Sequence, residues 1–201
     1  MSRAEQRQAH PLPDESKEMV EQAPLEMPAL EPIITPMIEE ALQNRQDQLR
    51  EFVVQSGTPE VTLQVHCGPD RLIKNQITIY CALGTVADIV HLTVDYLLPG
   101  EGQSLVYAEI QIRRQIRSEM PELPPHSGIA LYRAMLDFFQ DYANTHNRLV
   151  EHVVHGSMEM PFDKWKAIFL PTLEKYGYHG PFLEDLMLSY NKVYEPKTLE
   201  A

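Results

Sequence analysis

The stretch that decides the fold runs from residue 109 to residue 139 and reads EIQIRRQIRSEMPELPPHSGIALYRAMLDFF. Its first residues alternate between polar and apolar, which is typical of a strand with one buried face. A proline-rich loop follows, and Ser127 then stands where a helix N-cap is expected. The next apolar residues recur at helical spacing and predict a helix buried against a sheet. This stripe comprises Leu131, Met135, Phe138 and Tyr142, widened by Ile129, Leu136 and Phe139.

Positive charge gathers between this strand and this helix, where Arg113, Arg114 and Arg117 stand within five positions. A helix N-terminus exposes free N–H groups and the positive end of the helix dipole, and phosphates bind there. Arginine adds bidentate donors, and Gly128 lets the backbone approach a ligand closely. The sequence therefore predicts an anion site, the alternative being arginines that are solvated or paired with neighbouring acids.

Further elements follow from hydrophobic periodicity and turn residues on both sides of this stretch. Helices are expected at 35–57, with Thr35 as cap, Pro36 in the first turn and Gly57 at the end, and at 162–178, where Pro171 should kink or divide the helix. Strands are expected at 60–68, 76–84, 87–98, 104–114, 148–156 and 182–194. This order predicts an α+β domain with a mixed, mostly antiparallel central sheet flanked by helices.

The N-terminal segment differs in composition from the rest of the chain. Residues 1–36 contain six of the sixteen prolines and more acidic than basic residues. Such a segment buries too little apolar surface to offset its ordering entropy. We therefore expect a disordered, acidic, proline-rich tail over 1–36 and a single α+β domain over 37–201, with a docking segment around Met27 to Ile34 as the alternative for part of the tail.

The whole chain has 201 residues and a formal net charge of −12. This charge argues against a nucleic-acid binder and favours a cationic partner such as an amine. There is no apolar stretch of membrane-spanning length and no signal-peptide pattern, so we expect a protein of the cytoplasm that does not enter membranes. Cys67 and Cys81 form no C-x-x-C pair, and the eight histidines show no metal-binding spacing, so no metal is expected.

Several segments together carry a resemblance to a known family: IQIRR (110–114), HSGIALYRAMLDFFQDYA (126–143), RLVEHVVHG (148–156), LEKYGY (173–178) and LMLSYNKVY (186–194). From about residue 36 to residue 195 the chain resembles the GNAT superfamily of acyl-CoA N-acyltransferases. The segment 110–114 is similar to the family's splayed central strand. The segment 126–143 is similar to the end of its pyrophosphate-binding loop and the following helix, with Gly128 and Ala130 at the positions of the small residues.

The resemblance implies an acyl-CoA such as acetyl-CoA as cosubstrate and an amine-bearing small molecule or protein as acceptor. It places the coenzyme against Ile112, Arg113, Arg114, Arg117, Ser127, Gly128, Ile129 and Ala130. The base that takes the amine's proton would be Glu109 on the splayed strand or Glu151 on the next, with His152 as a third candidate. Leu173 stands where the family often has a tyrosine acid, so Tyr176 or Tyr178 would protonate the leaving thiolate.

Two other interpretations stay open. The chain could be a non-catalytic α+β domain that binds a protein partner through its tail or an exposed sheet edge. It could also be a small-molecule-binding protein whose anion site takes another phosphate ligand. Whether the chain turns over a substrate, and whether it is a monomer or a homodimer, is left open by the sequence.

Overall fold

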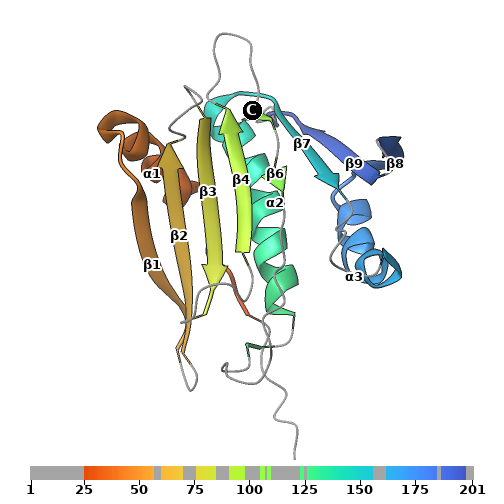
Figure 1. The fold of residues 1–201 in the computed structure, drawn as a ribbon, viewed down its shortest axis with the longest axis horizontal. Coiled ribbons are helices and arrows are strands. Elements are labelled where there is room, and N and C mark those ends of the chain that lie inside the picture. The colour runs from red at the N-terminus through yellow and green to blue at the C-terminus, as the bar shows by residue number, and fades with distance from the viewer. Residues whose placement is uncertain are drawn as a thin grey trace, which may run out of the picture.

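A computed structural model describes residues 25–56, 60–69, 76–84, 91–97, 105–106, 108–109, 123–124, 126–155, 162–184 and 187–197. These residues form an α+β fold of three helices and nine strands (Figure 1). None of the helices among them is long and apolar enough to cross a membrane.

The helices are α1 (Glu31–Asn44), α2 (Ser127–His146) and α3 (Phe162–Lys175). The strands are β1 (Gln48–Gln55), β2 (Val61–Pro69), β3 (Gln76–Leu83), β4 (His91–Leu97), β5 (Leu105–Val106), β6 (Ala108–Glu109), β7 (Val150–His155), β8 (His179–Glu184) and β9 (Met187–Tyr194). They form two sheets. The first has the order β1-β2-β3-β4-β6 and is antiparallel throughout; the second has the order β5-β7-β9-β8, with only the β5–β7 pair parallel.

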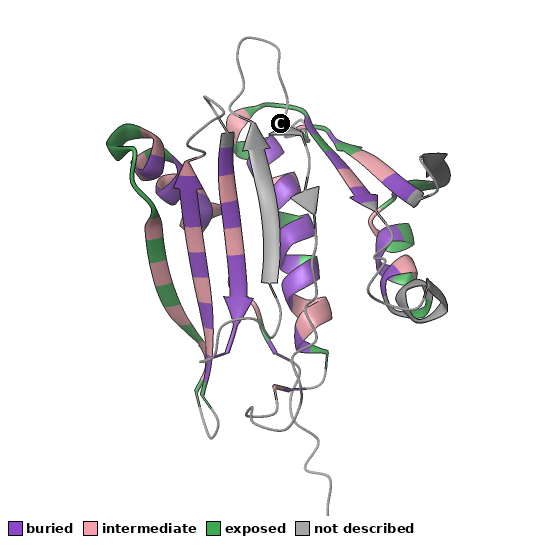
Figure 2. Ribbon diagram, viewed as in Figure 1, coloured by how far each residue is buried: buried purple, intermediate pink, exposed green. Residues whose placement is uncertain are grey.

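Helix α2 is the central element of the core, because it is buried on two faces. The predicted stripe from Leu131 to Tyr142 is buried, and Phe138 within it is fully buried. A second stripe of Tyr132, Leu136 and Phe139 is buried as well. Phe139 packs against His152 and Tyr194 of the second sheet, and Tyr132 packs edge-on against Phe169 of α3. Figures 1 and 2 show α2 along one face of the first sheet, with the second sheet branching away beside it.

The first helix begins and ends earlier than predicted. The sequence predicted a helix over 35–57, whereas α1 starts at Glu31, runs through Pro36 and ends at Asn44, and β1 follows. Arg45 adopts a left-handed conformation with φ 55° and terminates the helix. Beyond it, the alternating and β-branched residues of 48–55 suit a strand better than a further helical turn.

Two segments that were each predicted as one strand are divided. The segment 104–114 contains β5 and β6, which belong to different sheets, so the single central sheet of the prediction is two sheets. The segment 182–194 falls within the hairpin of β8 and β9. Gly180 has φ 148°, and a Cβ there would come within 2.8 Å of the Ser189 carbonyl oxygen, so the hairpin's close approach requires glycine at this position. The other predicted strands correspond to β2, β3, β4 and β7, and α3 continues through Pro171.

The folded part of the chain includes residues that the sequence analysis assigned to the tail. Leu25 and Leu30 are buried, and Ile34 of α1 is fully buried in the common core. The helical spacing of Ile34, Met37 and Ala41 turns one side of α1 toward that core. Residues 1–24 lie outside the described part of the chain.

This boundary can be tested by truncating one buried side chain. We expect Leu30→Ala to lower the free energy of unfolding by about 2–5 kcal/mol, because it removes a buried leucine and leaves a cavity. Leu49→Ala, at a leucine that is 63% exposed, should change it by less than about 0.5 kcal/mol. Urea unfolding followed by circular dichroism measures both. Equal effects of the two substitutions would contradict the placement of Leu30 in the core.

Candidate functional site

The two sheets meet where one short segment pairs with both. Leu105 and Val106 pair in parallel with Val150 and Glu151 of β7. Ala108 and Glu109 of β6 then pair antiparallel with Val94 and Thr93 of β4. The chain therefore passes from one sheet to the other within a few residues. The described pairing of β5 with β7 ends at Glu151, whereas β7 itself continues to His155.

The two glutamates that were predicted as bases lie beside this junction. Glu109 ends β6, with its backbone paired to Thr93; its side chain lies outside the described part. Glu151 is exposed and lies opposite Val106 in the last β5–β7 pair. Because His152 faces α2, Glu151 points to the other side of the second sheet. The structure therefore brings the backbones of both glutamates to the junction.

The N-terminus of α2 is built differently from the prediction. Ser127 was expected to cap the helix, but His126 is the N-cap, in a left-handed conformation with φ 67°, and Ser127 is the first helical residue. The buried Ser127 hydroxyl donates to the Pro124 carbonyl at 2.7 Å. Gly128 and Ile129 follow, and their amides make no hydrogen bond to a described residue. These first-turn amides are donors that can receive an anion.

The predicted arginines Arg113, Arg114 and Arg117, together with Ile112, lie outside the described residues. In sequence they fall between β6 and α2. Of the predicted coenzyme contacts, only Ser127, Gly128, Ile129 and Ala130 are therefore placed, all in the first turn of α2.

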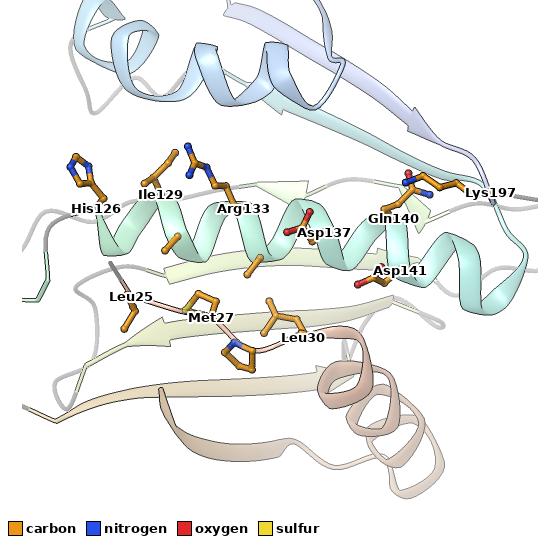
Figure 3. Close-up of a pocket in the computed structure, with 14 residues that line it drawn as sticks. Leu25, Met27, Leu30, His126, Ile129, Arg133, Asp137, Gln140, Asp141 and Lys197 are labelled. Carbon is orange, nitrogen blue, oxygen red and sulfur yellow. The ribbon is translucent and has the colours of Figure 1, made fainter. Parts of the chain in front are cut away.

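The third face of α2 lines a shallow groove (Figure 3), whose other wall is the segment from Leu25 to Leu30. Its cavity volume is about 570 Å³. The groove begins at His126, Ile129 and Ala130 and passes along Arg133, Ala134, Asp137, Gln140 and Asp141 to Lys197. It thus starts at the amides of the first turn and carries charges of both signs along its length.

Tyr176, the predicted acid, faces the groove side of α2. Its hydroxyl donates to Asp137 Oδ1 at 2.8 Å. Burial, followed by this hydrogen bond, raises the pKa of Tyr176, so its phenol stays protonated at neutral pH. Glu151 points away from α2, whereas Tyr176 contacts Asp137 of this helix. The structure therefore does not bring these two predicted catalytic residues together.

A Schellman turn separates the two tyrosines that follow α3. The Tyr178 amide donates to the Leu173 carbonyl and the Gly177 amide to the Glu174 carbonyl, with Gly177 left-handed at φ 76°. The turn leaves Tyr176 near the surface and buries Tyr178. Leu173, which the sequence analysis compared with a family tyrosine, is fully buried in the core.

The Tyr178 hydroxyl belongs to a buried polar chain between α2 and the second sheet. It bonds to His152 Nδ1 on one side and lies 2.8 Å from the Tyr194 hydroxyl on the other. Burial, then the nearby Tyr194, raises the pKa of Tyr178 well above its usual value. Lys192 Nζ lies 4.0 Å from the centroid of the Tyr194 ring.

Sequence reasoning had missed this polar chain as a unit, although it named two of its members. The available signal was a histidine at the middle of the otherwise apolar alternation Val150, His152 and Val154. A polar side chain on the buried face of a strand calls for polar partners nearby.

Other chemistry-bearing side chains are accounted for by the core. Cys67 and Cys81 are buried free thiols on neighbouring strands. Burial raises the pKa of the Cys67 thiol to about 12, so it is no nucleophile at neutral pH. Within the described ranges, no group of three or more His, Cys, Asp or Glu residues could hold a metal ion.

No family model, curated protein or solved structure matches this chain. The residues of the junction, the first turn of α2 and the groove therefore carry the functional argument.

The buried polar chain makes a prediction about stability. We expect Tyr178→Phe to lower the free energy of unfolding at pH 8 by about 1–3 kcal/mol, because two buried polar groups lose a partner. Tyr176→Phe is the matched control at a more exposed phenol, and it should lower the free energy of unfolding by a smaller amount.

The effect of Tyr178→Phe should also depend on pH. A tyrosine whose pKa is raised in the folded state contributes its full stability below its unfolded pKa of about 10 and loses it as pH rises further. Above pH 10 the difference in the free energy of unfolding between the unaltered protein and Tyr178→Phe should therefore narrow by about 1.4 kcal/mol per pH unit. Urea titrations from pH 8 to 11 measure this gap, and a constant gap would contradict the burial of the Tyr178 phenol.

Proposed function

We propose that this chain binds an acyl-CoA and transfers the acyl group to an amine, as its resemblance to the GNAT superfamily implies. The observation that carries the proposal is the division of 105–109 between two sheets, followed along the chain by a helix whose Gly128 and Ile129 amides bond to no described residue. A strand that leaves its neighbour and a helix N-terminus downstream of it are the two features that the family uses to hold coenzyme A.

The pyrophosphate of the coenzyme would accept hydrogen bonds from the amides of Gly128 and Ile129. The helix dipole would add to this attraction, since α2 is 20 residues long and its N-terminus would face the phosphates. Arg113, Arg114 and Arg117 precede the helix in sequence and would supply the charge that balances the phosphates.

The reaction is a direct attack of the amine nitrogen on the thioester carbonyl carbon. A C–N bond forms and the C–S bond breaks, while Glu151 takes the proton that the amine loses. We assign the base to Glu151, whose exposed side chain lies at the last β5–β7 pair. The coenzyme leaves as a thiolate and is protonated by solvent, since an ordinary thiol has a pKa of about 8.5. Tyr176 is bound to Asp137 and Tyr178 to its buried partners, so neither takes this role.

The acceptor is a cationic amine in this proposal. The chain carries a formal net charge of −12, which raises the local concentration of positively charged molecules and favours their encounter. An ammonium group must lose a proton before its nitrogen can attack, and in this proposal Glu151 assists that loss.

A binding measurement tests the coenzyme site. Acetyl-CoA at millimolar concentration should raise the melting temperature, whereas S-acetylpantetheine, which lacks the pyrophosphate, should raise it much less. Gly128→Asp should abolish the shift by acetyl-CoA, because it places a negative charge among the amides that bind the anion. Asp in the first turn is itself favourable for a helix, so this variant should remain folded.

Gly128→Asn is the matched neutral control and should retain most of the shift. An acetyl-CoA shift that survives Gly128→Asp, or no shift in the unaltered protein, would contradict this coenzyme site.

A second measurement tests the base. Release of free thiol from acetyl-CoA in the presence of a panel of primary amines should fall about 10²- to 10⁴-fold in Glu151→Gln, because general base catalysis contributes that much. The acetyl-CoA melting shift should remain, since Glu151 holds no part of the coenzyme. Glu195→Gln is a control at another exposed glutamate, and an equal loss in both variants would contradict the role of Glu151.

A further inference from the structure

Strand β1 forms an open edge of the first sheet. It is the terminal strand in the order β1-β2-β3-β4-β6, and no described segment pairs with its outer side. Figure 2 shows no buried residue along its eight positions. An edge of this kind presents unpaired N–H and C=O groups to which another extended segment can add.

One face of β1 carries the most exposed large apolar side chains of the described chain. Leu49 is 63% exposed and Val53 is 58% exposed. Both stand on the face that also carries Thr62 and His66 of β2, since these residues are their partners in the ladder. Figure 1 shows the helices on the other side of this sheet, so no described helix covers the face.

Glu51 stands between these two apolar residues on the same face. Its Oε1 accepts a hydrogen bond from Gln64 Nε2 at 2.7 Å, which holds the carboxylate over the strand. Arg50, the basic residue of the strand, lies on the opposite face and is paired with Glu40 of α1 at 2.8 Å. The order along the face is therefore apolar, acidic and apolar, with no basic side chain of β1 to neutralise it.

This pattern disfavours a second copy of the chain as the occupant. Residues opposite each other in an antiparallel pair lie on the same face. A register that sets Leu49 against Val53 of the other copy therefore also sets Glu51 against Glu51. Like charges directly opposite each other are destabilising, and the net charge of −12 on each copy adds to the repulsion.

We propose that β1 binds an extended segment of another protein as an added antiparallel strand, whose alternate residues are apolar, basic and apolar. The two apolar residues would pack against Val53 and Leu49, and the basic residue would face Glu51 between them. The bulge between Val53 and Gln55 ends the regular edge, so the bound segment spans about the first six residues of β1. This docking surface is separate from the proposed acyl-CoA site and does not depend on it.

A charge-swap experiment on the full chain tests this proposal. The probe is a labelled seven-residue peptide in which threonine alternates with valine, lysine and valine in that order, and its partner has glutamate in place of lysine. In fluorescence anisotropy the unaltered protein should prefer the lysine peptide by about two- to fivefold, as expected for a cross-strand charge pair. Glu51→Lys should reverse the preference.

A second variant tests the apolar contacts. The double substitution Leu49→Thr with Val53→Thr keeps residues that favour strands and should weaken binding of both peptides. Circular dichroism checks that each variant keeps the fold. The proposal is overturned by a preference that Glu51→Lys leaves unchanged, or by no binding at millimolar peptide. It is equally overturned if light scattering finds a dimer that this double substitution dissociates, because the face would then be an interface between copies of the chain.

Discussion

The fold depends on which strands pair with the backbone of the short strands β5 and β6. β5 pairs with the second sheet and β6 with the first, so one short segment joins two sheets that separate from it. Backbone N–H and C=O groups need hydrogen-bond partners, and this division gives partners to both short strands without a single continuous sheet. Helix α2 then packs against both sheets, which is why it needs two apolar faces. The proposed coenzyme site would extend from the first turn of α2 toward the junction, which lies beside the other end of the helix, because β7 begins at Val150 soon after α2 ends at His146.

The interior of this arrangement is polar at one place. His152, Tyr178 and Tyr194 lie between α2 and the second sheet. The Tyr178 hydroxyl hydrogen-bonds to both His152 Nδ1 and the Tyr194 hydroxyl. A buried hydrogen-bonded chain of this kind favours one packing arrangement, because a shift would separate the Tyr178 hydroxyl from His152 Nδ1 and from the Tyr194 hydroxyl. The turn at Gly177 is needed for it, since that turn sends Tyr178 inward and leaves Tyr176 beside Asp137. The polar chain therefore serves the fold, and the outward face of α2 remains available for ligands.

Periodicity predicted the elements whose surroundings are uniform. The stripe from Leu131 to Tyr142 has helical spacing and lies in α2, and the alternation of Val61, Leu63 and Val65 lies in β2. Periodicity could not predict where a regular strand pattern passes from one sheet to another. The alternation across 104–114 is regular, but the exchange from one sheet to the other depends on β7, which is distant in sequence. The 35–57 helix was extended too far for a local reason, because the left-handed Arg45 carries no glycine signal. In the candidate site, the first turn of α2 could be anticipated from Ser127 and Gly128, whereas the pairing of Tyr176 with Asp137 required the tertiary fold.

The most direct test of this account is to observe backbone amides while the coenzyme binds. In ¹⁵N-edited spectra of the full chain, acetyl-CoA should shift the amide signals of Gly128 and Ile129 and those of Val150 and Glu151 beside the junction. Signals of β1 should stay in place. Shifts confined to the groove residues Asp137 and Gln140, or no shifts at saturating coenzyme, would contradict the claim that the divided strand and the start of α2 form one acyl-CoA site.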